Sequence, residues 1–210
     1  MKTILLNGSP KTNNQSASGA LLEELCSFLL PKETALFDAH KPILDKNILY
    51  AIEQAQALAL AFPLYVDGIP SHLLHCMEQI QDYFKNKEHP LTVYTIVNCG
   101  FYESHQTAIA LEIIANWCAC CGFIWGQGAG IGGGGIMPYL QNVPSGHGPR
   151  KNISAVLKTL AENITKTNIG EPLFAVPNVP RFLYKMSAET GWRQMAKANG
   201  LKRKALFTRK

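Results

Sequence analysis

Residues 7–16 form the first segment of the chain whose side chains could do chemistry. The segment reads Asn-Gly-Ser-Pro-Lys-Thr-Asn-Asn-Gln-Ser, contains no acid, and precedes a stretch with helical spacing at 18–30. Hydroxyls, amides and a lysine beside the unpaired N–H groups of a helix N-terminus suit an anion, best a terminal phosphate. The Gly-Lys-Ser/Thr ending of a P-loop and the repeated glycines of the dinucleotide fingerprint are absent. The alternative is a polar connector in which Ser16 or Ser18 caps the helix.

Two further segments follow apolar runs and carry aromatic side chains. Residues 63–70, Pro-Leu-Tyr-Val-Asp-Gly-Ile-Pro, place apolar groups where a polar loop is usual, which suggests a flat hydrophobic ligand. In the alternative interpretation these side chains fold back into the core. Residues 98–105, Asn-Cys-Gly-Phe-Tyr-Glu-Ser-His, combine a glycine that allows close backbone approach with two aromatic rings that could flank a ligand ring.

Other motifs are less specific. Residues 128–133 fit the Gly-x-Gly-x-x-Gly spacing, but no helix clearly follows and no acid lies about 20 residues on. We therefore interpret 126–135 as a mobile or tightly turned loop, with a lid over the ligand as the alternative. Cys118, Cys120 and Cys121 lack the paired spacing of a metal site, so no metal is expected. His105 could donate a proton to a substrate, and His72 could line the pocket or face solvent.

These segments must be positioned by the apolar and helical stretches between them. Strand-like runs at 3–6, 33–37, 57–62, 91–97 and 122–126 alternate with helical patterns at 18–30, 45–56, 71–84, 104–121 and 150–164. This alternation predicts an α/β fold with a doubly wound parallel sheet, in which ligands bind at the carboxyl ends of the strands. The amino-acid composition of the sequence changes at residue 170. We therefore expect one domain at 1–169 and a basic, partly helical extension at 170–210 packed on it.

Composition limits the protein class. Hydrophobic residues make up 47% and charged residues 17%, which excludes disorder as the default state. No run approaches the ~18 uncharged apolar residues of a membrane span, and 3–6 is too short for a signal peptide. We expect a cytoplasmic protein with free thiols. The net charge of +5 does not separate small anionic ligands from nucleic acid. The basic tail could contact nucleic acid or a membrane, but we interpret it as a solvated helical face and expect neither partner.

Taken together, the three polar and aromatic segments resemble those of flavodoxin-like, FMN-binding NAD(P)H-dependent oxidoreductases, a group that includes FMN, quinone, azo and nitro reductases. Gly8-Ser9-Pro10-Lys11 and Asn14-Gln15-Ser16 resemble their phosphate loop, with Lys11 in place of the commoner Arg and Gln15 in place of Asn. Residues 63–65 and 98–101 resemble the loops that hold the isoalloxazine ring. The likeness spans roughly residues 1–165.

The resemblance implies a five-stranded parallel sheet of order 2-1-3-4-5, with FMN as cofactor and NAD(P)H as electron donor. It implies hydride transfer through the flavin to a small acceptor (a flavin, quinone, azo or nitro compound), with no essential catalytic side chain. It also implies a homodimer. The implied cofactor-binding residues are Ser9, Lys11, Asn14, Gln15, Ser16, Pro63, Leu64, Tyr65, Val66, Asn98, Cys99, Gly100 and Phe101. The alternatives are a flavodoxin-type electron carrier, which the net charge of +5 disfavours, and a flavin-free binding module of the same fold.

Overall fold

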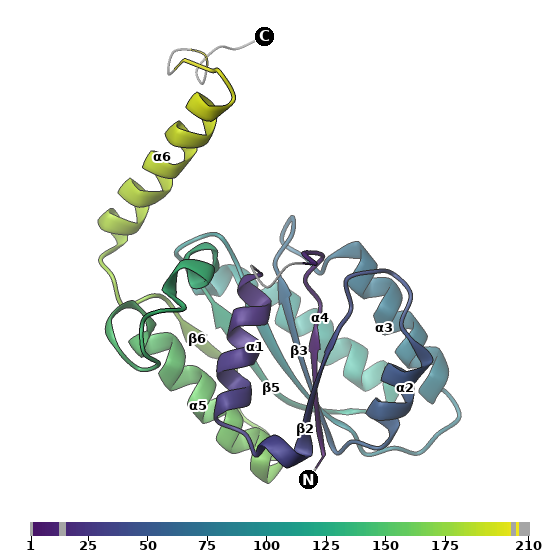
Figure 1. Ribbon diagram of the computed structural model, residues 1–210. Helices are drawn as coiled ribbons and strands as arrows, with labels where there is room; N and C mark the ends of the chain where they lie inside the picture. The colour runs from purple at the N-terminus through teal and green to yellow at the C-terminus, as the bar shows by residue number, and fades with distance from the viewer. Residues whose placement is uncertain (1, 13–15, 203–204, 206–210) are drawn as a thin grey trace. The chain divides into compact units, whose positions relative to one another are not determined.

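Six parallel strands form one sheet in the order β2-β1-β3-β4-β5-β6 (Figure 1). The structure is a computed structural model, and it describes residues 2–12, 16–202 and 205. β3 and β4 lie in the middle of the sheet and are buried almost throughout, as expected for continuous apolar strands covered on both faces. The strands are β1 (Thr3–Asn7), β2 (Thr34–Asp38), β3 (Ala57–Pro63), β4 (Thr92–Asn98), β5 (Ile124–Ile131) and β6 (Leu173–Ala175).

The sixth strand corrects the sequence-based prediction, which had five. β6 pairs with β5 through three residues, from Leu173 opposite Ala129 to Ala175 opposite Ile131. It was missed because a three-residue strand between Pro172 and Pro177 has the composition of a linker. The first compact unit of the chain therefore runs from Met1 to Pro177 and the second from Asn178 to Lys210, so the division falls after β6 rather than before residue 170.

Helices cover both faces of the sheet (Figure 1). Helices α1 (Ala17–Ser27) and α5 (Lys151–Lys166) pack on one face, and α2 (Lys46–Glu53), α3 (Ser71–Phe84) and α4 (Ala108–Cys121) on the other. The predicted caps Ser16 and Asp45 are confirmed by bonds from the N–H groups of Gly19 and Asn47. Ser71, predicted as a cap, is instead the first residue of α3. Short 3₁₀ helices occur at Pro31–Glu33, Ser104–Thr107, Gly134–Leu140 and Gly148–Arg150.

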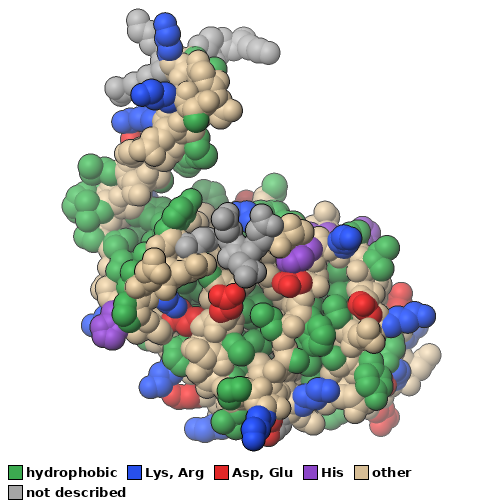
Figure 2. Space-filling model, viewed as in Figure 1, with side chains coloured by type: hydrophobic (Ala, Val, Ile, Leu, Met, Phe, Trp, Pro, Cys, Tyr) green, Lys and Arg blue, Asp and Glu red, His purple; other side chains and the backbone are tan. Residues whose placement is uncertain are grey.

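The second unit is one helix, α6 (Arg181–Ala198), followed by the C-terminal residues. None of its helical residues is buried. Figure 2 shows Lys and Arg side chains and hydrophobic side chains together on its surface. Within the described part of the chain, no helix combines the length and the apolar character needed to cross a membrane.

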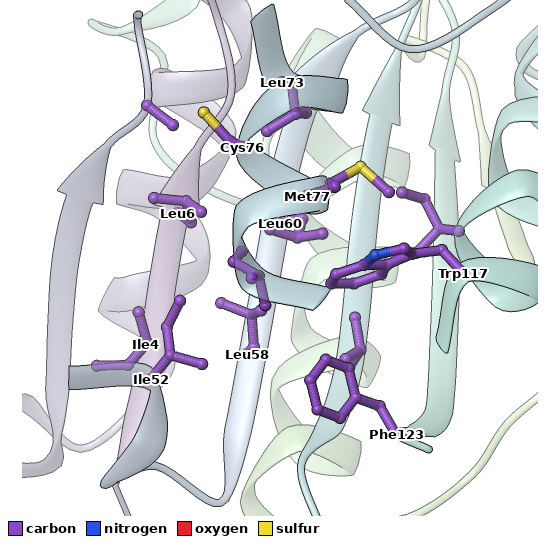
Figure 3. Packing of buried hydrophobic residues seen from close by; sticks show 14 of the residues in the cluster. Ile4, Leu6, Ile52, Leu58, Leu60, Leu73, Cys76, Met77, Trp117 and Phe123 are labelled. Atoms are coloured by element: carbon purple, nitrogen blue, oxygen red, sulfur yellow. The ribbon is translucent and has the colours of Figure 1, made fainter. Parts of the chain in front are cut away.

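The core beneath α2, α3 and α4 joins the carboxyl-end loops to the rest of the domain. Leu6 and Leu60 from the sheet meet Leu73 and Met77 from α3 and Trp117 from α4 (Figure 3). Leu73 also fills the space beside Gly8, where a Cβ would come within 2.6 Å of its side chain. The first loop therefore packs directly on the core, and a larger residue at position 8 would displace either the loop or the side chain of Leu73.

The glycines of 126–135 are not a mobile loop, because most of them belong to β5 and the turn that follows it. A Cβ on Gly126 would come within 2.7 Å of the Tyr94 ring, and one on Gly128 within 2.8 Å of Leu111. A Cβ on Gly132 would overlap the carbonyl of Tyr102. The glycines thus let neighbouring side chains and the loop after β4 approach the strand closely. The interpretation as a tightly turned loop is therefore confirmed only for residues 132–135, which follow β5.

A buried ion pair holds the long connection between β5 and α5. The carboxylate of Glu24, on α1, accepts bonds from the guanidinium of Arg150 and the hydroxyls of Ser145 and Ser154. Arg150 also donates to the carbonyl of Val143 at 2.7 Å. A cavity of about 320 Å³ lies beside this cluster. The side-chain partners satisfy the buried carboxylate, so the cluster fixes the connection against α1.

Candidate functional site

The three segments singled out in the sequence meet at one edge of the sheet. They follow β1, β3 and β4, which are neighbours in the sheet. The N–H of Gly8 donates to the backbone carbonyl of Ala61 at 2.7 Å, and the N–H of Leu64 donates to the backbone carbonyl of Asn98 at 2.8 Å. The hydroxyl of Ser18, in the first turn of α1, donates to the side-chain oxygen of Asn98 at 2.7 Å. Hydrogen bonds therefore connect the segments after β1, β3 and β4 into one site.

The first loop, residues 8–16, has the polar character that an anion requires. Ser9 is buried, its N–H donates to the side chain of Asn7 at 3.1 Å, and its hydroxyl accepts from the N–H of Lys11 at 3.3 Å. Ser16 caps α1, whose first turn contains no acid. The predicted contacts Asn14 and Gln15 lie outside the described residues. The described part fits a phosphate, because hydroxyls, a cation and a helix N-terminus lie together.

The tip of the second loop, residues 63–70, projects apolar side chains into solvent. Tyr65 and Gly68 exchange backbone hydrogen bonds at 3.1 and 3.0 Å, which closes a two-residue turn at Val66 and Asp67. Both turn residues have positive φ, +49° and +58°, as in a type I′ hairpin. Tyr65 is 45% exposed and Val66 is fully exposed, whereas Pro63 and Leu64 are half-buried. The tip of this loop thus presents an apolar surface, whereas Leu64 and Ile69 pack on the core, as the alternative interpretation predicts for these side chains.

The third loop begins with a thiol that faces the protein. Cys99 is buried, and its S–H points to the carbonyls of Phe101 and Glu103. Burial raises the pKa of this thiol, which disfavours a reactive thiolate. A ligand contact at Cys99 would therefore come from its backbone. The next residues are open: Gly100 has no atom within 4 Å of its Cβ position, and Phe101 is 57% exposed.

Other residues considered in the sequence analysis, His105 and the cysteines of α4, lie outside the three loop segments or at their end. The His105 ring stacks on Phe174 of β6, with ring centroids 4.2 Å apart. Burial raises the pKa of the Cys118 thiol to about 12, which disfavours a reactive thiolate. Across the described residues, no group of three His, Cys, Asp or Glu side chains is placed to hold a metal ion.

Two histidines hold the first loop; His72 was considered in the sequence as a residue that could line the pocket, whereas His40 was not identified. His40, just after β2, bonds the carbonyl of Ser9 at 2.7 Å, and His72, in α3, bonds the carbonyl of Gly8 at 3.1 Å. The predicted site segments follow β1, β3 and β4, and the segment after β2 was not among them. His40 follows Asp38 at the carboxyl end of β2, and that position was the available signal. A small cavity of about 60 Å³ lies between these elements, with Lys11, Asp38, His40 and Glu23 among its lining residues.

Comparison with known proteins identifies the fold. No protein-family model matches the sequence, and no curated protein matches it significantly. The chain is 16% identical to an NADH:FMN oxidoreductase solved in its apo form, with a TM-score of 0.58 over 86% of this chain and 96% of that one. For an NADPH-quinone reductase from P. pentosaceus the identity is 11% and the TM-score 0.56, over 81% and 100% of the two chains.

A WrbA-like flavodoxin from Agrobacterium tumefaciens is also similar. It has 11% identity and a TM-score of 0.53, over 78% of this chain and 99% of that one. At such identities the likeness establishes the fold alone, and it confirms the resemblance seen in the sequence at that level. The chain has the flavodoxin-like α/β fold, extended by a sixth parallel strand.

Proposed function

We propose that the protein is an FMN-dependent oxidoreductase that takes electrons from NAD(P)H and passes them to a small acceptor such as a flavin, quinone, azo or nitro compound. One observation supports this most. An acid-free polar loop at the N-terminus of α1 is hydrogen-bonded to neighbouring segments that lead to the exposed side chains of Tyr65 and Phe101. A phosphate and a flat aromatic ring, joined by a short chain, match this combination.

In this proposal each loop has its own task. Ser9, Lys11 and Ser16, with Asn14 and Gln15, would hold the phosphate. Pro63 to Val66 would contact the ring from one side, and Asn98 to Phe101 would contact it from the other. Bound FMN supplies the hydride and electron chemistry, so the protein needs only to bind, orient and partly shield it. The apolar tips at Tyr65 and Phe101 would exclude water from one part of the ring and leave room for a second flat molecule.

We also propose a homodimer in the cytoplasm. The exposed apolar side chains of the site loops and of α6, among them Trp192 and Phe182, support a second subunit. All six cysteines are free, which agrees with a reducing compartment. The resemblance to dimeric flavoenzymes supports the same assembly.

The test is a flavin titration followed by a donor assay. The purified, ligand-free protein should quench FMN fluorescence, and it should bind FMN more tightly than riboflavin, which lacks the phosphate. Lys11→Gln should weaken FMN binding by about 3- to 10-fold and leave riboflavin binding unchanged. Lys158→Gln, on the exposed side of α5, is the matched control and should change neither.

The same samples separate the rival functions. NADH or NADPH should bleach the bound flavin, and an added quinone should restore its colour. FMN binding without reduction by either nucleotide would indicate an electron carrier instead. Absence of FMN binding would leave a flavin-free module as the function.

A further inference from the structure

His40 is one member of a closed circuit of polar contacts around the first loop. The amide of Asn7 donates to the carboxylate of Asp38 at 2.9 Å, and the side-chain oxygen of Asn7 accepts from the N–H of Ser9. The carbonyl of Ser9 accepts from Nδ1 of His40, and Nε2 of His40 lies 3.5 Å from the same Asp38 oxygen. The peptide groups on both sides of Ser9 are therefore held by side chains from the ends of β1 and β2.

The contacts indicate which form of His40 suits this circuit. A carbonyl oxygen only accepts hydrogen bonds, so Nδ1 must carry a proton. Nε2 faces a carboxylate, which also accepts. The imidazolium has N–H groups at both nitrogens and is the form that uses both acceptors. In that form its positive charge offsets the negative charge of Asp38 next to the loop.

His72 has a different state. Its Nε2 donates to the carbonyl of Gly8. Burial lowers the pKa of His72 and is the largest influence on it, and the nearby His40 lowers it further, whereas hydrogen bonds to the backbone of Gly8 and of Ala39 raise it. The net effect is a lowered pKa, which favours the neutral form of His72. The other charged groups that line the small cavity with His40 are Lys11, Glu23 and Asp38.

We propose that His40 is a positioning residue for phosphate recognition, which fixes Ser9 and makes phosphate binding depend on proton uptake at its ring. The inference rests on the proposed binding of FMN. With His40 charged, its positive charge offsets the negative charge of Asp38, and the loop attracts a phosphate dianion. With His40 neutral, the carboxylate of Asp38 repels the phosphate, and the charge of His40 no longer adds to that of Lys11 in opposing this repulsion. The contribution of His40 to phosphate affinity should therefore be larger at acid pH than at alkaline pH.

The experiment measures Kd for FMN and for riboflavin between about pH 5.5 and about pH 8.5. The phosphate itself gains its second charge near pH 6, so each variant is compared with the wild type at the same pH. His40→Gln keeps a donor without a titrating charge. It should bind FMN about 10-fold more weakly than the wild type at the acid end and about equally at the alkaline end.

Two further variants complete the test. Asp38→Asn removes the charge that His40 offsets, so it should bind FMN more tightly than the wild type at the alkaline end. His75→Gln, on the exposed side of α3, is the matched control and should follow the wild type throughout. Riboflavin should bind all four proteins equally, because it has no phosphate.

The possible results are distinct. A constant ratio between His40→Gln and the wild type across the pH range overturns the inference while leaving FMN binding in place. Equal losses for FMN and riboflavin would show that His40 only supports the fold. A wild-type protein that binds no FMN would reject the proposed function, and the inference with it.

Discussion

Val66 stands out at the scale of single residues, because its backbone conformation suits it poorly. It has φ +49° at the first position of the turn after β3, and its side chain is fully exposed. A left-handed conformation costs a β-branched residue about 1–2 kcal/mol, and type I′ turns favour Asn or Gly there. No burial offsets this cost. Strain of this kind collects at ligand sites, and here it projects an isopropyl group beside the proposed ring site.

Val66→Asn should therefore stabilise the protein and impair its site. We expect the free energy of unfolding to rise by about 1 kcal/mol, since Asn tolerates the left-handed region. FMN affinity should fall a few-fold, because an amide replaces an apolar contact with the ring. Urea unfolding with an unchanged m-value and a flavin titration measure the two effects. Val66→Ala, which keeps a strained side chain, should gain less stability. Lower stability in Val66→Asn would contradict the account.

Single residues also show which positions at this edge of the sheet could be predicted from the sequence. Ser16, Tyr65 and Phe101 were located by their place after apolar runs, because the fold type fixes the edge at which strand-end loops gather. His40 could not be assigned that way. Its role depends on the pairing of β1 with β2, which brings His40 next to Ser9. The residues around His40, Ala39 and Lys41, form no sequence motif that would indicate this contact.

At the scale of elements, periodicity predicted most of the helices and strands. The bounds of α3 were predicted without error, since its apolar spacing is clear and Pro70 precedes it. β5 was predicted too short, because glycines give no apolar signal even when they lie within a strand. The side chains that surround those glycines come from elements distant in sequence, so only the folded structure explains them.

Gly130 provides the test of this close packing. A Cβ there would overlap the hydroxyl of Thr107 and come within 2.7 Å of the Phe174 ring. Gly130→Ala should therefore destabilise the protein by about 1–3 kcal/mol, because the α4 side and β6 must both move. Gly135→Ala is the matched control: its Cβ would meet nothing within 4 Å, and the change should be neutral or stabilise slightly. Thermal unfolding of the two variants compares them, and equal melting temperatures would reject the packing argument.

At the scale of the whole molecule, charge is divided unevenly between the two units. Residues 178–210 contain nine Lys and Arg but one acid, a net charge of +8, whereas residues 1–177 contain eleven and fourteen, a net charge of −3. The modest total of +5 conceals this division. α6 also exposes Phe182, Met186, Trp192 and Met195, each by more than half of its surface. A helix with these properties is poorly stable alone in water and suits an acidic, partly apolar partner surface.

The proposed homodimer offers such a surface in the first unit of a second copy. The full chain should therefore be dimeric by light scattering at low salt and should dissociate as salt screens the attraction. A chain ending at Pro177 should be monomeric, yet keep its melting temperature, because no residue of α6 is buried.

Trp192→Ala should weaken the dimer in the full chain, whereas Tyr50→Ala, an equally exposed aromatic on α2, should not. A strictly monomeric full chain would reject the dimer, and a shortened chain that remains dimeric would reject the role of α6. Salt-independent association would show that apolar contacts, rather than the opposite charges of the two units, hold the copies together.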